Sequence, residues 1–165
     1  MNKKGFTLVE VIAVTLIIAA LALLVVPSFK NSALTNQMEK AKVGLVELTT
    51  AVKLYREAHT EPISGVFDNA MFNALTDPAD EVYLRNANRW AHRPGSATEY
   101  SLIDVNGVLN CQYTITAASS TSPLLSSALC QFPKVDEDGT ECYNFYMEKA
   151  NPAVIKKQDG DCSGL

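Results

Sequence analysis

The sequence has few of the groups that catalysis or metal binding uses. It contains two histidines, His59 and His92, and no C-x-x-C pair, which argues against a zinc site. It also lacks the G-x-S-x-G, P-loop, H-E-x-x-H and G-x-G-x-x-G motifs, so the common hydrolase, nucleotide-binding, metalloprotease and dinucleotide-binding signatures are absent. We therefore expect a protein that is not an enzyme, holds no metal and needs no cofactor.

Charged residues are also few, and their balance is slightly acidic. Only 19% of the residues are charged and the formal net charge is -4, which argues against nucleic acid as the principal partner. Hydrophobic residues make up 47% of the chain, which excludes a disordered protein. A length of 165 residues suits one compact domain with an anchor.

The apolar residues are concentrated at the N-terminus. Residues 6–26 contain a single charged residue, Glu10. About 20 helical residues span a bilayer, so this segment is long enough to cross it once. Lys3 and Lys4 precede the segment and predict a cytoplasmic N-terminus in the inner membrane.

Two ordinary targeting signals compete for this segment. Residues 20–22 (Ala-Leu-Ala) match the cleavage site of a secretory signal peptide, which would release a secreted binding module beginning at Leu23. Against this, the apolar run continues through Val26 with no polar stretch before the cut. A plain signal anchor fits the length and the lysines but gives Glu10 no role.

A third interpretation accounts for Glu10 as well. Residues 4–10 (KGFTLVE), followed by apolar residues up to Pro27, resemble the class III signal of type IV prepilins and pseudopilins. The resemblance covers roughly the first thirty residues. It implies that a prepilin peptidase cuts between Gly5 and Phe6, and that the new N-terminus at Phe6 is then methylated. Pro27 matches a proline that is common in the family.

The resemblance also implies a mechanism of assembly. An ionised side chain within a membrane helix costs about 2.5–3.5 kcal/mol, so Glu10 is expected to be functional. Cleavage would expose an α-amino group on Phe6, and pairing it with Glu10 of an adjacent copy would offset both burial costs and fix the register. Glu10, Thr7 and Pro27 are therefore the expected assembly residues. The expected partners are membrane lipid before assembly, prepilin peptidase, the pilus assembly machinery and further copies of the chain in a helical filament.

Beyond the apolar segment the sequence predicts an amphipathic helix. Its apolar positions recur at alternating spacings of four and three: Leu34, Met38, Ala41, Leu45, Leu48, Val52 and Tyr55. Such a seam can join a coiled coil or lie across a sheet of the same chain. Three heptads are short for a coiled coil and strand-like sequence follows, so we favour the sheet. The helix is expected to end near His59, before Pro62.

Strand signals follow residue 98. Residues 99–105 alternate in polarity, and Asn106-Gly107 predicts a type I′ hairpin into a second strand over 108–116. Residues 141–147 predict a third strand and 153–157 a fourth. The expected fold class is α+β, with a long N-terminal helix packed on a small antiparallel sheet, as in pilins.

The chain therefore divides into five expected regions. They are a leader peptide (1–5), a transmembrane and filament-core helix (6–27), an amphipathic helix (28–60), a connecting loop region (61–98), and an antiparallel sheet with a disulfide-bounded C-terminal region (99–165).

Four cysteines lie in the last third of the chain, at Cys111, Cys130, Cys142 and Cys162. An even number behind an export-directed segment predicts two disulfides formed in an oxidising compartment. Three pairings are open. We prefer Cys111–Cys130, which would restrain the Ser-rich stretch 119–123, together with Cys142–Cys162, which would enclose a terminal loop like the disulfide-bounded region of pilins.

Two charged clusters give weaker indications of function, and the first is a group of arginines. Arg85, Arg89 and Arg93 would share one face of a helix, beside Trp90 and His92, and DNA binding there is a minor alternative to solvated arginines.

The acidic run 136–141 offers several oxygens for calcium, which some pseudopilins bind. Its spacing is not that of an EF-hand, and a solvated acidic turn is the preferred interpretation.

The sequence thus predicts a structural subunit of a type IV pilus-like filament, located in the inner membrane before assembly and outside the cell afterwards. The alternatives within this architecture are a minor pilin or a type II secretion pseudopilin. Major pseudopilins often lack disulfides, so four cysteines favour a pilus. Motility, adhesion, DNA uptake and secretion are not distinguished by the sequence.

Overall fold

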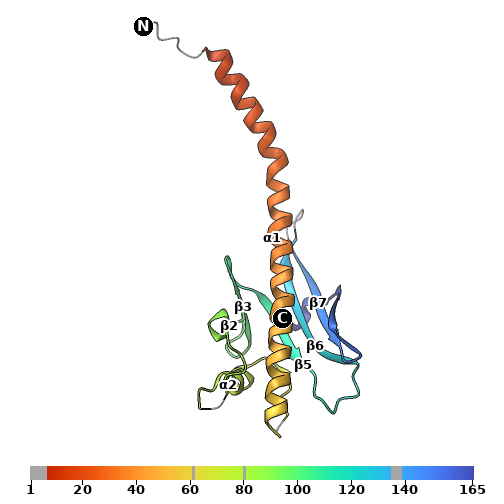
Figure 1. Cartoon of the computed structure of the whole chain (residues 1–165). Helices are drawn as coiled ribbons and strands as arrows, with labels where there is room; N and C mark the ends of the chain where they lie inside the picture. Colours follow the sequence, from red (N-terminus) through yellow and green to blue (C-terminus); the bar gives the residue numbers. More distant parts are fainter. Residues whose placement is uncertain (1–6, 61, 80, 135–138) are drawn as a thin grey trace.

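The computed structural model describes residues 7–60, 62–79, 81–134 and 139–165, and the side chains of residues 23–30 are outside the description. Figure 1 shows one long helix that lies across a sheet at its lower end and projects far beyond the globular part at its upper end. The helical elements are α1 (Leu8–Ala58), α2 (Asn69–Thr76) and the short 3-10 helices η1 (Ala87–Arg89) and η2 (Cys162–Gly164).

Within the described residues, the strands form two antiparallel sheets. The larger has the order β1-β5-β6-β7-β8, with β1 (Gly65–Val66), β5 (Asn110–Ile115), β6 (Leu124–Pro133), β7 (Thr140–Glu148) and β8 (Asn151–Asp159). The smaller has the order β2-β3-β4, with β2 (Trp90–His92), β3 (Tyr100–Asp104) and β4 (Gly107–Val108). The α+β fold class predicted from the sequence is confirmed.

Helix α1 is one unbroken element of 51 residues, about 76 Å long at 1.5 Å per residue. It continues past Pro27, and Figure 1 shows its upper half leaning away from the axis of its lower half. His59 caps its C-terminus, with the His59 N–H donating to Tyr55 O at 2.9 Å. Among the residues that the structure describes, no helix is both long and apolar enough to cross a membrane.

The lower half of α1 packs its apolar seam against the sheet of its own chain, which confirms the interpretation favoured from the sequence. Ala41, Leu45, Leu48 and Val52 are buried in the core. At the ends of the seam, the partly buried side chains that pack against this core are Leu34, Met38 and Tyr55. A seven-residue apolar period is thus satisfied within one subunit.

The helix and the sheet approach each other closely at Gly44. A Cβ atom there would lie 2.5 Å from Leu102 Cδ1 and 2.8 Å from the Tyr113 hydroxyl, so any larger residue would force these side chains to shift. Small residues of β6, Ser126 and Ala128, are fully buried, and the Thr49 hydroxyl donates to Ser126 Oγ at 2.8 Å. Small side chains on both elements therefore set the helix–sheet distance.

Strands are found at all four expected positions, but residues 108–116 are divided between β4 and β5, which belong to different sheets. Two further details of the strand prediction are wrong. Strand β6 is the longest strand and was not predicted. The hairpin after β3 pairs Asp104 with Gly107, so its two loop residues are Val105 and Asn106. A type I′ turn on Asn106-Gly107 needs a positive φ at Asn106, and no described non-glycine residue has one.

The prediction that three arginines share one face of a helix is also wrong. Arg85 lies in a turn, Arg89 ends η1, and Arg93 follows β2. Trp90 begins β2 and is buried. The described structure therefore offers no common helical face on which these arginines would meet DNA.

Arg93 instead is the buried member of a chain of hydrogen-bonded polar side chains that joins the two sheets. Its guanidinium pairs with Glu99 through Nε and Nη2, both at 2.8 Å, and Nη1 donates to Asn110 Oδ1 at 3.0 Å. Asn110 Nδ2 donates to Gln131 Oε1, and Gln131 Nε2 donates to Thr140 Oγ1. The chain runs from the end of β2 through β5 and β6 to the start of β7.

A second ion pair connects the small sheet to α1 and makes the stability dependent on pH. The Lys40 ammonium hydrogen-bonds to Asp104, whose side chain is almost fully buried. This bond holds the pKa of Asp104 below its ordinary value, with help from the backbone N–H of Val105 and from Gln37. A carboxyl with a lowered folded pKa contributes stability above its unfolded pKa of about 3.9 and loses that contribution as the pH falls through the folded pKa.

We therefore expect Asp104→Asn to lower the free energy of unfolding by about 1 kcal/mol at neutral pH, because Lys40 is partly exposed and solvent weakens the pair. The difference between wild type and variant should vanish in strong acid, where Asp104 is protonated. Denaturant unfolding of both chains at neutral and acidic pH measures this. A difference of equal size at both pH values would contradict the assignment.

Candidate functional site

The first turn of α1 holds two of the expected assembly residues in one hydrogen-bonded unit. Thr7 is the N-cap, with extended backbone angles. Its backbone N–H and its hydroxyl both donate to Glu10 Oε2, at 2.8 and 2.9 Å, and the Glu10 N–H donates to Thr7 Oγ1 at 3.3 Å. This is a capping box, in which each side chain satisfies a backbone donor of the other residue.

The sequence carries the signal for this cap. Thr7-Leu8-Val9-Glu10 has the T-x-x-E spacing of a capping box before an apolar run. Sequence reasoning assigned both residues to assembly and missed their contact. The helix therefore begins at Leu8 because Thr7 and Glu10 together satisfy its first donors.

The capped carboxylate keeps part of its bonding capacity. Both side-chain bonds reach Oε2, and Oε1 forms none within the described residues. Glu10 is exposed and lies near the helix N-terminus. The arrangement presents a carboxylate of fixed orientation, able to accept a hydrogen bond from an external cation.

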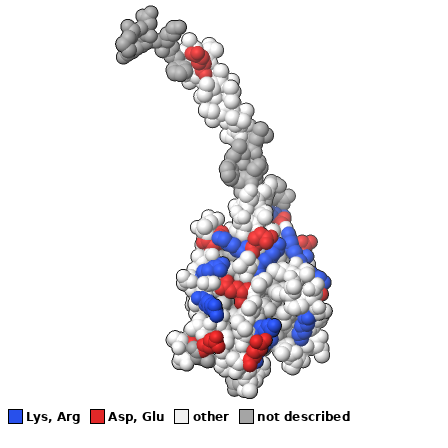
Figure 2. Space-filling view, in the orientation of Figure 1, with Lys and Arg blue, Asp and Glu red and all other residues white. Residues whose placement is uncertain are grey.

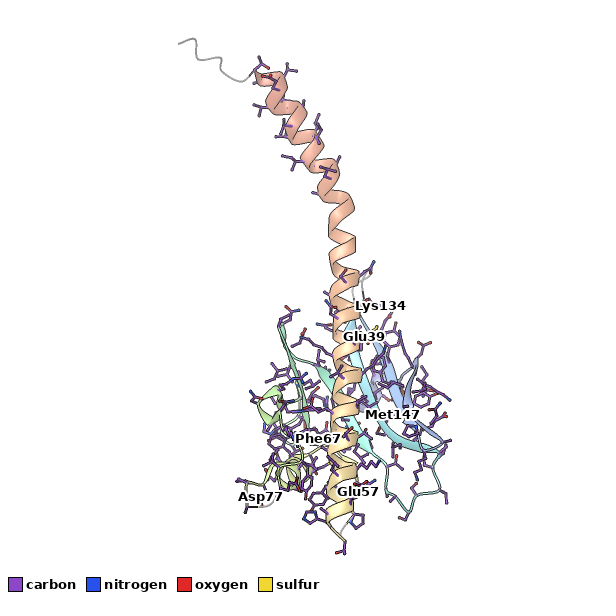
Figure 3. All side chains as sticks on the ribbon, in the orientation of Figure 1. Glu39, Glu57, Phe67, Asp77, Lys134 and Met147 are labelled. Carbon is purple, nitrogen blue, oxygen red and sulfur yellow. A yellow bond between two sulfur atoms is a disulfide. The ribbon has the colours of Figure 1, made fainter. Side chains whose placement is uncertain are left out.

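Glu10 is also the sole charged residue between Leu8 and Ala22. Figure 2 shows this projecting part of α1 as uncharged except for one acidic side chain near its end. Figure 3 shows its side chains radiating on all sides. Large apolar side chains here are 50–78% exposed, among them Leu8, Ile12 and Leu16. A helix that is apolar all round requires burial by lipid or by other chains.

Of the remaining expected site residues, the structure describes only the backbone of Pro27. Gly5 and Phe6, the expected cleavage position, lie outside the described residues. Pro27 lies within α1, and nothing is described of its side chain.

Both disulfides have the pairing preferred from the sequence. Cys111 and Cys130 are directly opposite each other on β5 and β6 and are fully buried. Cys142 of β7 is bonded to Cys162 of η2, which holds the C-terminal tail against the sheet, where Gly160 N donates to Cys142 O at 2.8 Å.

The expected reason for the first bridge is wrong. Cys111–Cys130 lies at the end of the β5–β6 hairpin away from the Ser-rich stretch. That stretch is held by local bonds, in which Ser122 N donates to Ser120 Oγ and Lys149 Nζ donates to Ser120 O. The bridge instead joins two core strands beneath α1.

Of the acidic run 136–141, the structure describes residues 139–141. Residues 136–138 lie outside the described residues. Glu141 Oε2 accepts a hydrogen bond from the Tyr143 hydroxyl. In the described ranges, no three His, Cys, Asp or Glu side chains gather closely enough to hold a metal ion.

Comparison with known families gives one match. Residues 1–26 match the family model for the prokaryotic N-terminal methylation motif, the class III signal of type IV pilins and pseudopilins. No curated protein and no solved structure matches the chain. The match confirms the resemblance found in residues 4–10. It supports a type IV pilin-like or pseudopilin subunit, and it implies a membrane-anchored precursor, processing by a prepilin peptidase and assembly into pilus-like filaments.

Proposed function

We propose that this chain, which carries an N-terminal methylation motif, is a structural subunit of a type IV pilus-like filament and not an enzyme. The proposal is supported mainly by the methylation motif. A second observation agrees with it: Glu10 caps a helix segment that is otherwise uncharged and whose apolar side chains are exposed. Such a helix has two suitable environments, the bilayer before assembly and a bundle of identical helices afterwards.

Processing would supply the partner of Glu10. Cleavage between Gly5 and Phe6 creates an α-amino group next to Thr7, and methylation on nitrogen leaves that amine able to carry its positive charge. In a filament, the amine of one copy would meet the carboxylate of another. The capping box supports this proposal, because it fixes the carboxylate at the helix end where the amine is created.

The proposal includes the division of the chain given by the sequence. Residues 1–5 form the leader, 6–27 the membrane and filament-core helix, and 28–60 the amphipathic helix. The globular part would lie outside the membrane, in the compartment that oxidises its cysteines. After assembly it would lie on the outside of an extracellular filament.

A pilus is favoured over a secretion pseudopilin by the two disulfides. Both bridges fasten the globular part, which suits a subunit that works outside the cell without chaperones. A minor pilin fits the same architecture. A secreted module cut after Ala22 would discard Glu10, and the methylation motif counts against it.

Mass spectrometry of the mature chain tests the proposal. We expect an N-terminus at Phe6 carrying one extra methyl group, and fibres that contain this chain on cells observed by electron microscopy. A mature chain that begins at Leu23, or that retains Met1–Gly5 in the working protein, would overturn it.

A further inference from the structure

Positive charge gathers around two adjoining hollows where the lower half of α1 meets the sheet near the β7–β8 turn. The hollows have volumes of about 190 and 510 Å³ and share Thr49, Lys53 and Leu125 as walls. Their charged lining residues are three cations and one acid, namely Lys53, Arg56, Lys149 and Glu57. We call the two hollows with these three cations the basic hollow.

The cations of the basic hollow have little negative charge close to them. The Arg56 guanidinium and the Lys149 ammonium donate to backbone carbonyls, and in the described part of the chain neither pairs with a carboxylate. Lys53 Nζ lies 3.9 Å from Glu57, and both side chains are largely exposed, so solvent screens this pair. A cleft lined mainly by charge of one sign attracts a ligand of the opposite sign.

The longest run of acidic residues in the chain follows the far end of β6. Residues 136–138 read Asp-Glu-Asp, and they lie between Lys134 and Gly139. The Lys134 N–H donates to Gly139 O at 3.0 Å, so the two described flanks of the run are joined to each other. Chain geometry then limits the reach of residues 135–138 beyond these flanks to less than about 10 Å, because the segment must return.

One chain cannot bring this run to its own basic hollow. Pro133, at the end of β6, lines a hollow with Gln37 of α1, whereas Leu125, near the start of β6, lines the basic hollow with Lys53. Gln37 and Lys53 are separated by 53 − 37 = 16 residues of α1, about 24 Å along the helix axis. Figure 3 accordingly labels Lys134 toward the upper end of the globular part and Glu57 toward its lower end.

We propose that the basic hollow of one copy receives the acidic run 136–138 of a second copy of this chain. The inference rests on the proposed filament function and names one contact within it. Opposite charges at opposite ends of the globular part make the contact head-to-tail, and such a heterologous contact repeats as a fibre when it does not close. Complementary charge also fixes the register of neighbouring copies.

Exchanging the two charges tests the contact in the full chain. Lys53→Glu and Glu137→Lys each bring like charges together, and we expect each to lower fibre yield ~10-fold or more. The double variant Lys53→Glu/Glu137→Lys restores opposite charges and should recover fibres. The Lys53 side chain is 77% exposed, so these chains should unfold at the wild-type denaturant concentration.

Lys156→Glu is the matched control. It makes the same change of charge on β8, outside the basic hollow, and it disrupts a partly exposed pair with Glu148. This variant should assemble normally. Fibre loss equal to that of Lys53→Glu would show that any added acid prevents assembly, which would overturn the proposal.

A carbodiimide identifies the contact in wild-type fibres, because it forms an amide, with loss of water, between a carboxylate and a lysine amine that touch. In fibres mixed from ¹⁴N and ¹⁵N chains, the expected peptides join residues 136–138 of one copy to Lys53 or Lys149 of another.

Three results would overturn the contact while the filament function stands. They are normal fibres from both single variants, crosslinks of the run only to other segments, and a double variant that does not recover. A run that binds calcium instead would give the last of these, with a fibre yield that depends on calcium. Failure of the wild-type chain to form fibres would instead overturn the proposed function.

Discussion

Replacing Glu10 by leucine is expected to leave membrane insertion intact and to abolish fibres. The substitution removes the charge whose burial in the membrane costs about 2.5–3.5 kcal/mol, so insertion should improve slightly. It also removes the proposed partner of the Phe6 amine. If that pair stabilises each added subunit by about 3 kcal/mol, the association constant per subunit falls roughly 100-fold. Membrane fractionation and fibre counts by electron microscopy measure the two effects.

Glu10→Gln separates the charge from the cap. The glutamine oxygen can still accept from the Thr7 N–H and hydroxyl, so the capping box is retained while the carboxylate charge is lost. We expect this variant to fail in assembly as the leucine variant does. Thr7→Ala removes the cap and keeps the charge, at a cost of about 1 kcal/mol to the helix end, and should retain fibres at lower yield. Normal fibres from Glu10→Gln would show that the charge has no role in assembly.

Arg93→Met is expected to destabilise the globular part strongly, because it removes one partner of a largely buried ion pair. The Arg93 side chain is 7% exposed and binds Glu99 through two nitrogens. Methionine leaves the Glu99 carboxylate largely buried without its cation, which typically costs about 3–5 kcal/mol. It also interrupts the polar chain through Asn110. Trp90, the single tryptophan, is buried nearby in β2, so its fluorescence can follow denaturant unfolding.

Arg89→Met provides the matched control. Arg89 pairs with Glu47 at 3.2 Å, but its side chain is 43% exposed, so solvent screens the pair. We expect a loss below about 1 kcal/mol. Equal losses from the two variants would show that burial of the Arg93–Glu99 pair contributes nothing beyond an ordinary surface ion pair.

The sequence predicted the long helix well because its pattern is local. The spacing of Leu34 to Tyr55 repeats every seven residues, and the same positions form the buried seam. Strands β7 and β8 were also predicted, because aromatic and β-branched residues gather there. Local chemistry is sufficient where each residue's preference agrees with its tertiary environment.

Strand β6 could not be predicted for the opposite reason. Its inward positions include Ser126, Ala128 and Cys130, small residues without strong strand preference. They are small because α1 crosses close above them, which is a tertiary fact absent from the local sequence. The arginine stripe failed similarly, since Arg93 is placed by Glu99 and not by the helical spacing of its neighbours.

For the candidate site, the sequence proposes the residues but not their geometry. The class III signal located Gly5, Phe6 and Glu10 by their order in the chain. The hydrogen bonds between Thr7 and Glu10 follow from backbone angles at the helix start, which a motif does not contain.

The fully buried Cys111–Cys130 bond has a consequence for the order of maturation. Both sulfur atoms lie in the same core cluster as Ala41, Leu45 and Leu48 of α1. An oxidising enzyme can reach these thiols only while the helix is still away from the sheet. Oxidation is therefore expected to precede helix docking, and once docked, α1 shields the bond from reductants in solution.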